Sequence, residues 1–102
     1  MVLPITPINA QRKLAEHLRE RRLALGLTQE GLALRSGVSL PTLRKFEQKG
    51  LISLASYLKL VMIVGGLDEL VSVTAPPVAE FSSIDEVINA TSKPKPKRGR
   101  RT

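Results

Sequence analysis

Residues between positions 10 and 25 repeat with the spacing of a helix. The repeat at i, i+4, i+8 and i+11 falls on Leu14, Leu18, Arg22 and Leu25. This spacing predicts an amphipathic helix that turns one face toward a core. Asn9 is expected to cap the helix, because its side-chain oxygen can accept a free backbone N–H of the first turn. Gly26 is expected to end it, since glycine readily takes a left-handed conformation.

Two shorter helices follow, and a few residues that include a glycine separate them. The pattern predicts one helix over residues 28–36, capped by Thr28 and ended at Gly37. The next helix is expected over residues 39–49, with Leu43 and Phe46 turned inward. Gly50 closes it.

Pro41 stands near the front of the second of these helices. If Ser39 is the N-cap, the proline occupies the second helical position. A backbone N–H at that position has no partner within the helix, so its absence in proline costs no hydrogen bond. The proline is therefore compatible with a helix at this position.

A fourth helix is predicted between a Ser53 cap and the Gly65-Gly66 pair, and a short fifth one over residues 67–71. Pro76-Pro77 then breaks the chain. The sequence thus predicts an all-α, five-helix domain. Four segments are expected: a flexible arm (1–8), the folded domain (9–75), a linker with a possible helical turn at 83–90 (76–92), and a disordered basic tail (93–102).

The composition narrows the classes of function. The chain has 102 residues, no cysteine and one histidine, His17. Disulfides and thiolate zinc sites are therefore excluded, and no Ser/His/Asp set or phosphate-binding glycine loop supports an enzyme. We expect no cofactor and no metal. A span of 18 apolar residues and a signal-like start are both missing from the sequence, which favours a cytoplasmic protein that does not enter a membrane.

The net charge of +7 is distributed in blocks. Residues 12–49 hold nine basic side chains against four acidic ones, and residues 50–92 hold one against five. Residues 93–102 hold six basic side chains and no acid. Two basic regions around an acidic one indicate an anionic polymer as partner at two places and a different surface between them.

A helix, a glycine turn and a second helix with a basic outer face are typical of a helix-turn-helix, whose second helix enters the major groove. The chain also resembles the lambda-repressor/Cro-like, or XRE, family from about Leu14 to Leu70. The matching residues are Leu27-Thr28-Gln29, Leu32-Ala33, Gly37-Val38-Ser39, Leu43, Phe46 and Glu47. The resemblance implies sequence-specific binding of double-stranded DNA.

The DNA-binding residues follow from the outer face of the predicted reading helix and from the start of the helix before it. They are Gln29, Ser39, Leu40, Pro41, Thr42, Arg44, Lys45, Gln48 and Lys49. Gln29 and Ser39 are expected on phosphates, and Arg44 and Lys45 on guanine edges or phosphates. Leu40 or Thr42 is expected on a thymine methyl. The alternative is that this charged strip is only a solvated helix face.

Two charged residues fall on apolar helix faces. Glu47 lies beside Phe46, and Arg22 lies in the apolar row of the first helix. The family resemblance implies that they form an ion pair that fixes the first helix against the reading helix. The alternative is two ordinary surface charges.

Two residues depart from the family pattern. Gly31 stands where an acidic partner for the Thr28 cap is usual, and Leu34 faces outward where a polar residue is usual. The second helix is therefore expected to be less stable than in relatives, or covered by a partner.

A homodimer on a palindromic operator is expected, because one reading helix covers only a few base pairs. The preferred dimer surface comprises Leu60, Ile63, Leu67, Leu70 and Val71, and a short strand over residues 71–74 is the alternative. The basic tail is expected along DNA phosphates through Lys93, Lys95, Lys97, Arg98, Arg100 and Arg101. A purely solubilising tail is the alternative.

The order of these segments resembles that of the HipB-like antitoxins, which repress their own operon and bind a HipA-like kinase toxin. The residues expected to bind such a partner are Phe81, Ile84, Val87 and Ile88, in an acidic block that has little else to bury them. The competing interpretation is a stand-alone transcriptional regulator of the XRE family without a toxin partner.

Overall fold

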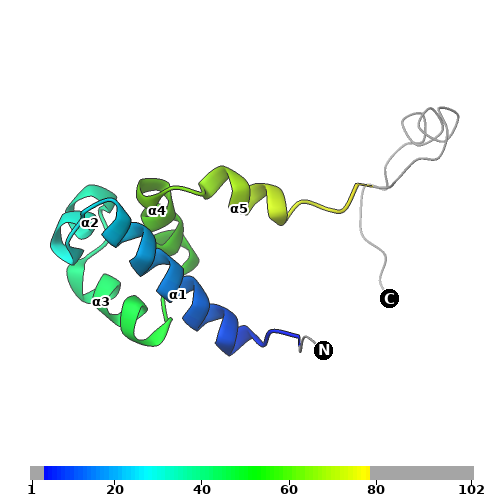
Figure 1. Ribbon diagram of the computed structural model, residues 1–102, viewed down its shortest axis with the longest axis horizontal. Helices are drawn as coiled ribbons and strands as arrows, with labels where there is room; N and C mark the ends of the chain where they lie inside the picture. The colour runs from blue at the N-terminus through cyan, green and yellow to red at the C-terminus, as the bar shows by residue number, and fades with distance from the viewer. Residues whose placement is uncertain (1–3, 79–102) are drawn as a thin grey trace, which may run out of the picture.

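The structure, a computed structural model, describes residues 4–78. This part of the chain forms five α-helices and no strand (Figure 1). The helices are α1 (Pro7–Ala24), α2 (Gln29–Ser36), α3 (Leu40–Lys49), α4 (Leu54–Val64) and α5 (Leu67–Val73). The predicted all-α, five-helix class is confirmed. The predictions for the turn at 83–90 and for the tail at 93–102 concern residues outside the described part.

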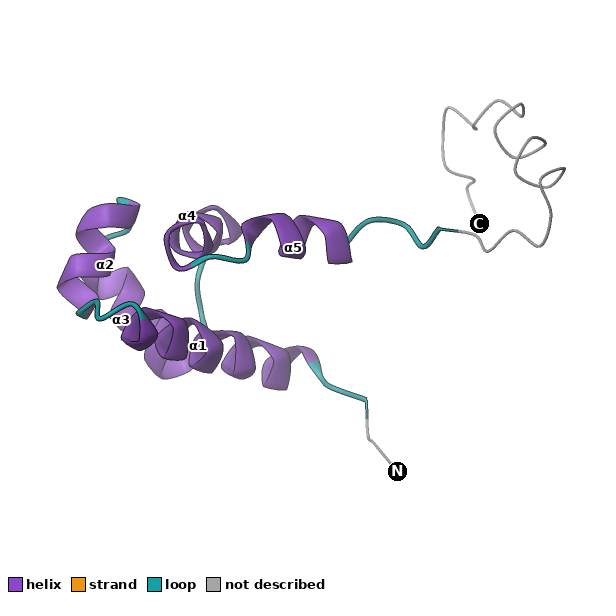
Figure 2. Cartoon of the chain, turned by 45° about the horizontal axis from the view of Figure 1, so that its top comes forward, coloured by secondary structure: helices purple, strands orange, loops and turns teal. Residues whose placement is uncertain are grey.

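The first four helices enclose one core, which we call the four-helix core. Its buried side chains are Ala15, Leu18, Leu32, Val38, Leu43, Phe46, Leu60 and Val64. Tyr57 packs edge-on against Phe46, with 5.5 Å between the ring centres. Figures 1 and 2 both show α5 extending beyond α4, away from α2 and α3. The fold thus has a packed body and one projecting helix.

Local chemistry sets most helix ends, as the sequence predicts. The side chains of Thr28, Ser39 and Ser53 each cap a helix by accepting a backbone N–H three residues later, over 2.9, 3.3 and 3.1 Å respectively. Gly37 and Gly50 close α2 and α3 in the left-handed conformation. Pro41 lies in the first turn of α3 without breaking it.

The start of α1 differs from the prediction. The helix begins at Pro7, and its cap is Thr6, whose hydroxyl accepts the backbone N–H of Asn9 over 3.2 Å. The predicted Asn9 cap and an arm that reaches residue 8 are therefore wrong. Proline favours an early start, because its fixed φ suits a first helical turn and that turn needs no N–H donor.

The buried face of α1 is also rotated from the predicted one. Ala15, Leu18 and Arg22 are buried, whereas Leu14 and Leu25 remain 39% and 54% exposed. Leu25 is the residue after the last helical turn, where the helical period no longer fixes a face. The spacing of apolar residues therefore predicts the helix correctly, but it identifies only Leu18 and Arg22 among the buried residues.

Two predictions about the dimer surface are corrected. Leu60 is fully buried in the four-helix core, so its side chain is not free to contact a second copy. The alternative strand over residues 71–74 is wrong, because residues 71–73 belong to α5. Ile63 packs partly against the core, while Val71 is 63% exposed.

Candidate nucleic-acid interface

α3 has one face in the core and one in solvent. Leu43 and Phe46 are 0% and 2% exposed, so they fix the helix against the body. The predicted reading residues Pro41, Arg44, Lys45 and Gln48 are all exposed, as is Lys49 at the end of the helix. The structure therefore brings the basic side chains of α3 together on a surface open to a large ligand.

The start of α3 holds the smaller candidates. The hydroxyl of Ser39 donates to Oγ1 of Thr42 over 2.7 Å and accepts the backbone N–H of the same residue. Leu40 and Thr42 are half-buried, while Ser39 is exposed. Ser39 is thus engaged as the cap, and contacts of Leu40 and Thr42 with DNA are restricted to the part of each side chain that remains open.

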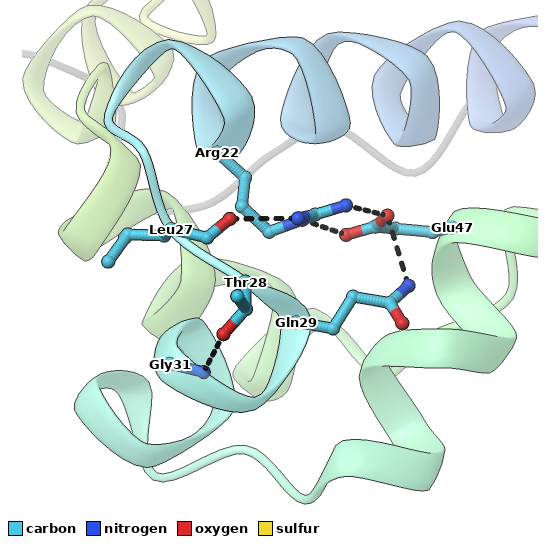
Figure 3. Close-up of polar contacts among 6 residues, drawn as sticks. All are labelled: Arg22, Leu27, Thr28, Gln29, Gly31 and Glu47. Carbon is cyan, nitrogen blue, oxygen red and sulfur yellow. Dashed lines mark hydrogen bonds and ion pairs between the residues drawn. The ribbon is translucent and has the colours of Figure 1, made fainter.

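A buried polar network ties α1 to α3 (Figure 3). Arg22 and Glu47 meet through two parallel hydrogen bonds, from Nε to Oε2 over 2.8 Å and from Nη2 to Oε1 over 2.9 Å. Their side chains are only 7% and 4% exposed. Arg22 also donates from Nη1 to the carbonyl of Leu27 over 2.9 Å, which fixes the turn before α2. A bidentate pair of an arginine and a carboxylate is geometrically specific, so it holds α3 in one orientation relative to α1.

Gln29 joins this network as its third side chain (Figure 3). Its Nε2 donates to Oε1 of Glu47 over 3.2 Å, and the residue is half-buried at the first turn of α2. The sequence predicts Gln29 on a phosphate, and one of the two N–H donors of its side chain is engaged with Glu47 in the protein alone. The free backbone N–H groups at the start of α2 still offer an anion a favourable position.

The cap of α2 tolerates glycine at position 31. Thr28 Oγ1 accepts the backbone N–H of Gly31 over 2.9 Å, although no acidic side chain is present there to return the bond. Half of a capping box therefore suffices to begin the helix. Leu34, on the same helix, is 86% exposed, as its outward position in the sequence predicts.

One acidic residue at this surface, Glu30, is not predicted by the helical pattern. Oε1 of Glu30 accepts a hydrogen bond from Nη2 of Arg44 over 3.2 Å, and the two side chains are 63% and 50% exposed. Their separation of 14 positions hides the pairing. The available signal is the short turn between α2 and α3, which brings the start of one helix beside the outer face of the next.

A cleft of about 300 Å³ lies between α1, α4 and α5. Its lining includes Leu18, Tyr57, Val61, Leu70 and Val73, with His17, Arg21 and Glu69 also on its walls. Arg21 donates from Nη1 to the carbonyl of Gly65 over 2.8 Å, which links α1 to the α4–α5 connection. Burial raises the pKa of Tyr57, and the nearby Arg21 charge opposes part of that rise.

The remaining predicted residues fall outside the described part of the chain. They are the partner-binding set Phe81, Ile84, Val87 and Ile88 and the tail residues Lys93, Lys95, Lys97, Arg98, Arg100 and Arg101. Within residues 4–78, no helix has the length and apolar character required to cross a membrane. No metal-binding group of three or more His, Cys, Asp or Glu side chains occurs in the same range.

Comparison with known proteins agrees with this geometry. Residues 18–65 match a protein family described as Helix-turn-helix, and the matched segment runs from within α1 to the end of α4. No curated protein and no solved structure matches the chain. The family match supports a helix-turn-helix DNA-binding domain of a transcription regulator within residues 18–65.

Proposed function

We propose that the protein is a sequence-specific transcriptional repressor that binds a palindromic operator as a homodimer. The observation that carries the proposal is α3 itself. Its outer face is basic and exposed, and its inner face is held by two fully buried apolar side chains and a buried ion pair. A pre-oriented basic helix suits the major groove, because little ordering is required when it binds.

Hydrogen-bonded reading of bases falls to Arg44 and Lys45, which are exposed and have long donor side chains. Leu40 and Pro41 carry no side-chain donor, so they contribute through shape and contact with methyl groups. Basic side chains that reach only phosphates add affinity without sequence information. This division predicts that different substitutions on α3 affect affinity and specificity separately.

The direct test measures binding to an operator located by footprinting on the protein's own promoter. Lys45→Gln should weaken operator binding by about tenfold, since a good base contact contributes ~1–3 kcal/mol of discrimination. Lys59→Gln removes the same charge from the exposed side of α4 and should change binding by less than about twofold. Equal losses in the two variants would contradict reading by α3.

The homodimer is proposed to form through α5 and the cleft beside it. Support comes from α5, which buries no residue and leaves Val71 63% exposed. Val71→Asp should convert the dimer to monomer in sedimentation experiments and weaken operator binding. Val78→Asp is the matched control, because Val78 is 88% exposed and lies beyond the end of α5. A Val71→Asp protein that remained dimeric would exclude this face.

The finer proposal is an antitoxin of a HipBA-like operon, in which residues 76–92 bind a kinase toxin and residues 93–102 bind DNA phosphates. Support comes from the acidic charge of the first segment and the basic charge of the second. A kinase-like reading frame beside the gene would favour this role over a stand-alone regulator.

Removal of residues 93–102 should flatten the salt dependence of DNA binding. An unchanged slope would leave the tail a solubilising role.

If the kinase exists, pull-down with the purified toxin locates its binding segment. A chain that ends at residue 75 retains all five helices and should lose the toxin. Equal retention by this chain and by the full protein would refute the assignment to Phe81, Ile84, Val87 and Ile88.

A further inference from the structure

Glu30 is an acidic side chain at the edge of the basic face of α3. It contacts Arg44 through a single hydrogen bond of 3.2 Å between Oε1 and Nη2. The other acid near this face, Glu47, is buried and engaged with Arg22, so its charge is already paired. Glu30 is 63% exposed, and its contact with Arg44 places its charge beside the basic face of α3.

The contact has two consequences for a DNA ligand. The carboxylate restrains the guanidinium of Arg44, which is otherwise a long and mobile group that binds a phosphate as readily as a guanine. The same carboxylate repels phosphates that approach Arg44. Both effects disfavour binding that depends on charge alone and favour binding in which Arg44 meets a base edge.

Stability does not account for the pair. An exposed ion pair with one hydrogen bond contributes little to folding, because both side chains remain in water. The carboxylate also lies in the first turn of α2, where the helix dipole favours an acid whether or not Arg44 is present. Any effect of the contact between Glu30 and Arg44 is therefore expected on the DNA-bound state rather than on folding.

We propose that Glu30 is a specificity-determining positioning residue, which orients Arg44 for base recognition and suppresses its use as a phosphate contact. The proposal rests on the function proposed above, because it requires α3 to read DNA. It predicts that Glu30 weakens binding to arbitrary DNA while it sharpens the choice of operator.

The test compares Glu30→Gln with wild type on the footprinted operator and on a scrambled duplex of equal length, at several salt concentrations. Glu30→Gln should bind the scrambled duplex about threefold to tenfold more tightly and lose about tenfold in the ratio of operator to scrambled affinity. The matched control is Glu20→Gln, which makes the same change at an exposed acid on α1, away from α3 and from the proposed dimer face. Its ratio should stay within about twofold of wild type.

Two further variants separate contact from charge. Glu30→Asp keeps the charge but shortens the side chain, so it should lower the affinity ratio without tightening binding to the scrambled duplex. In an Arg44→Gln background, Glu30→Gln should cause no further loss in the ratio. Melting curves confirm that each variant is folded.

The outcomes distinguish the role of Glu30 from sequence-specific DNA binding itself. A wild-type protein that binds both duplexes equally refutes sequence-specific binding, and the role of Glu30 with it. A clear wild-type preference, together with equal ratios for Glu30→Gln and Glu20→Gln, refutes the role of Glu30 alone. A loss that persists in the Arg44→Gln background also overturns it.

Discussion

The helices α3 and α5 are both short, yet the protein holds them in different ways. α3 has a side-chain cap at its start, a left-handed glycine at its end and two nearly fully buried side chains. α5 begins at Leu67, its N-cap Gly66 provides no side-chain hydrogen bond, and the helix has no buried residue. A helix of this length gains its stability from packing of its apolar face. The apolar face of α3 is thus buried by the other helices of the same chain, whereas the apolar residues of α5 need a further surface to pack against.

The buried ion pair gives the strongest way to test this contrast. Glu47→Gln should lower the free energy of unfolding by about 3–5 kcal/mol, because Arg22 then keeps a buried charge without a counter-charge. Glu69→Gln makes the same change on the exposed surface of α5 and should cost less than about 0.5 kcal/mol. Urea unfolding of the two variants and of wild type measures both values.

Similar losses in the two variants would mean that α3 is no better anchored than α5. An unchanged stability of Glu47→Gln would leave Arg22 and Glu47 as ordinary surface charges in solution. Because Gln29 also donates to Glu47, a Gln29→Ala variant should show a smaller loss of the same sign.

The glycines beside these helices provide the next contrast. Gly50 and Gly66 both have positive φ, of 74° and 103°, so alanine is strained at either position. A Cβ at Gly50 would lie 3.0 Å from the backbone of Gln11, whereas at Gly66 it would meet the guanidinium of Arg21 at 3.1 Å. Backbone cannot move aside as a long side chain can. Gly50→Ala should therefore cost about 3 kcal/mol and Gly66→Ala about 1–2 kcal/mol in the free energy of unfolding.

Gly37→Ala separates strain from crowding. Its φ of 76° is close to that of Gly50, but an added Cβ would have no atom within 4 Å. Thermal unfolding of the three variants should rank Gly50→Ala as the most destabilised. If Gly37→Ala lost as much as Gly50→Ala, the backbone of α1 would not restrict the end of α3.

The helix ends were predictable from the sequence because their causes are local. Thr28, Ser39 and Ser53 each satisfy an N–H three residues away, and glycine supplies the left-handed residue after α2 and α3. The exposed position of Arg44 and Lys45 follows from the period of one helix. These features can be predicted without knowing which helices pack against each other.

The parts that the sequence did not predict depend on how helices meet. Ala15 is buried in place of Leu14, and a small apolar residue gives only a weak signal in a helical pattern. Leu60 reads equally well as core or dimer surface until α2 is packed against α4. Glu30 is adjacent to Arg44 only after the turn between α2 and α3 has formed. Each of these results comes from tertiary contacts rather than from local propensity.

The smallest expected effect concerns Tyr57, which lies in the cleft beside α5. Burial raises its pKa above the usual 10.0, so the folded protein holds the phenolic proton more tightly than the unfolded chain. This contribution to stability is complete below about pH 10 and is lost as the pH rises through the folded-state value. The difference in unfolding midpoint between wild type and Tyr57→Phe should be constant from about pH 7 to 9 and shift in favour of phenylalanine above about pH 10.

A second copy that covered the cleft would bury the phenol further and move that shift to higher pH as the protein concentration increases. A shift that does not depend on concentration would instead indicate that the cleft beside α5 stays open.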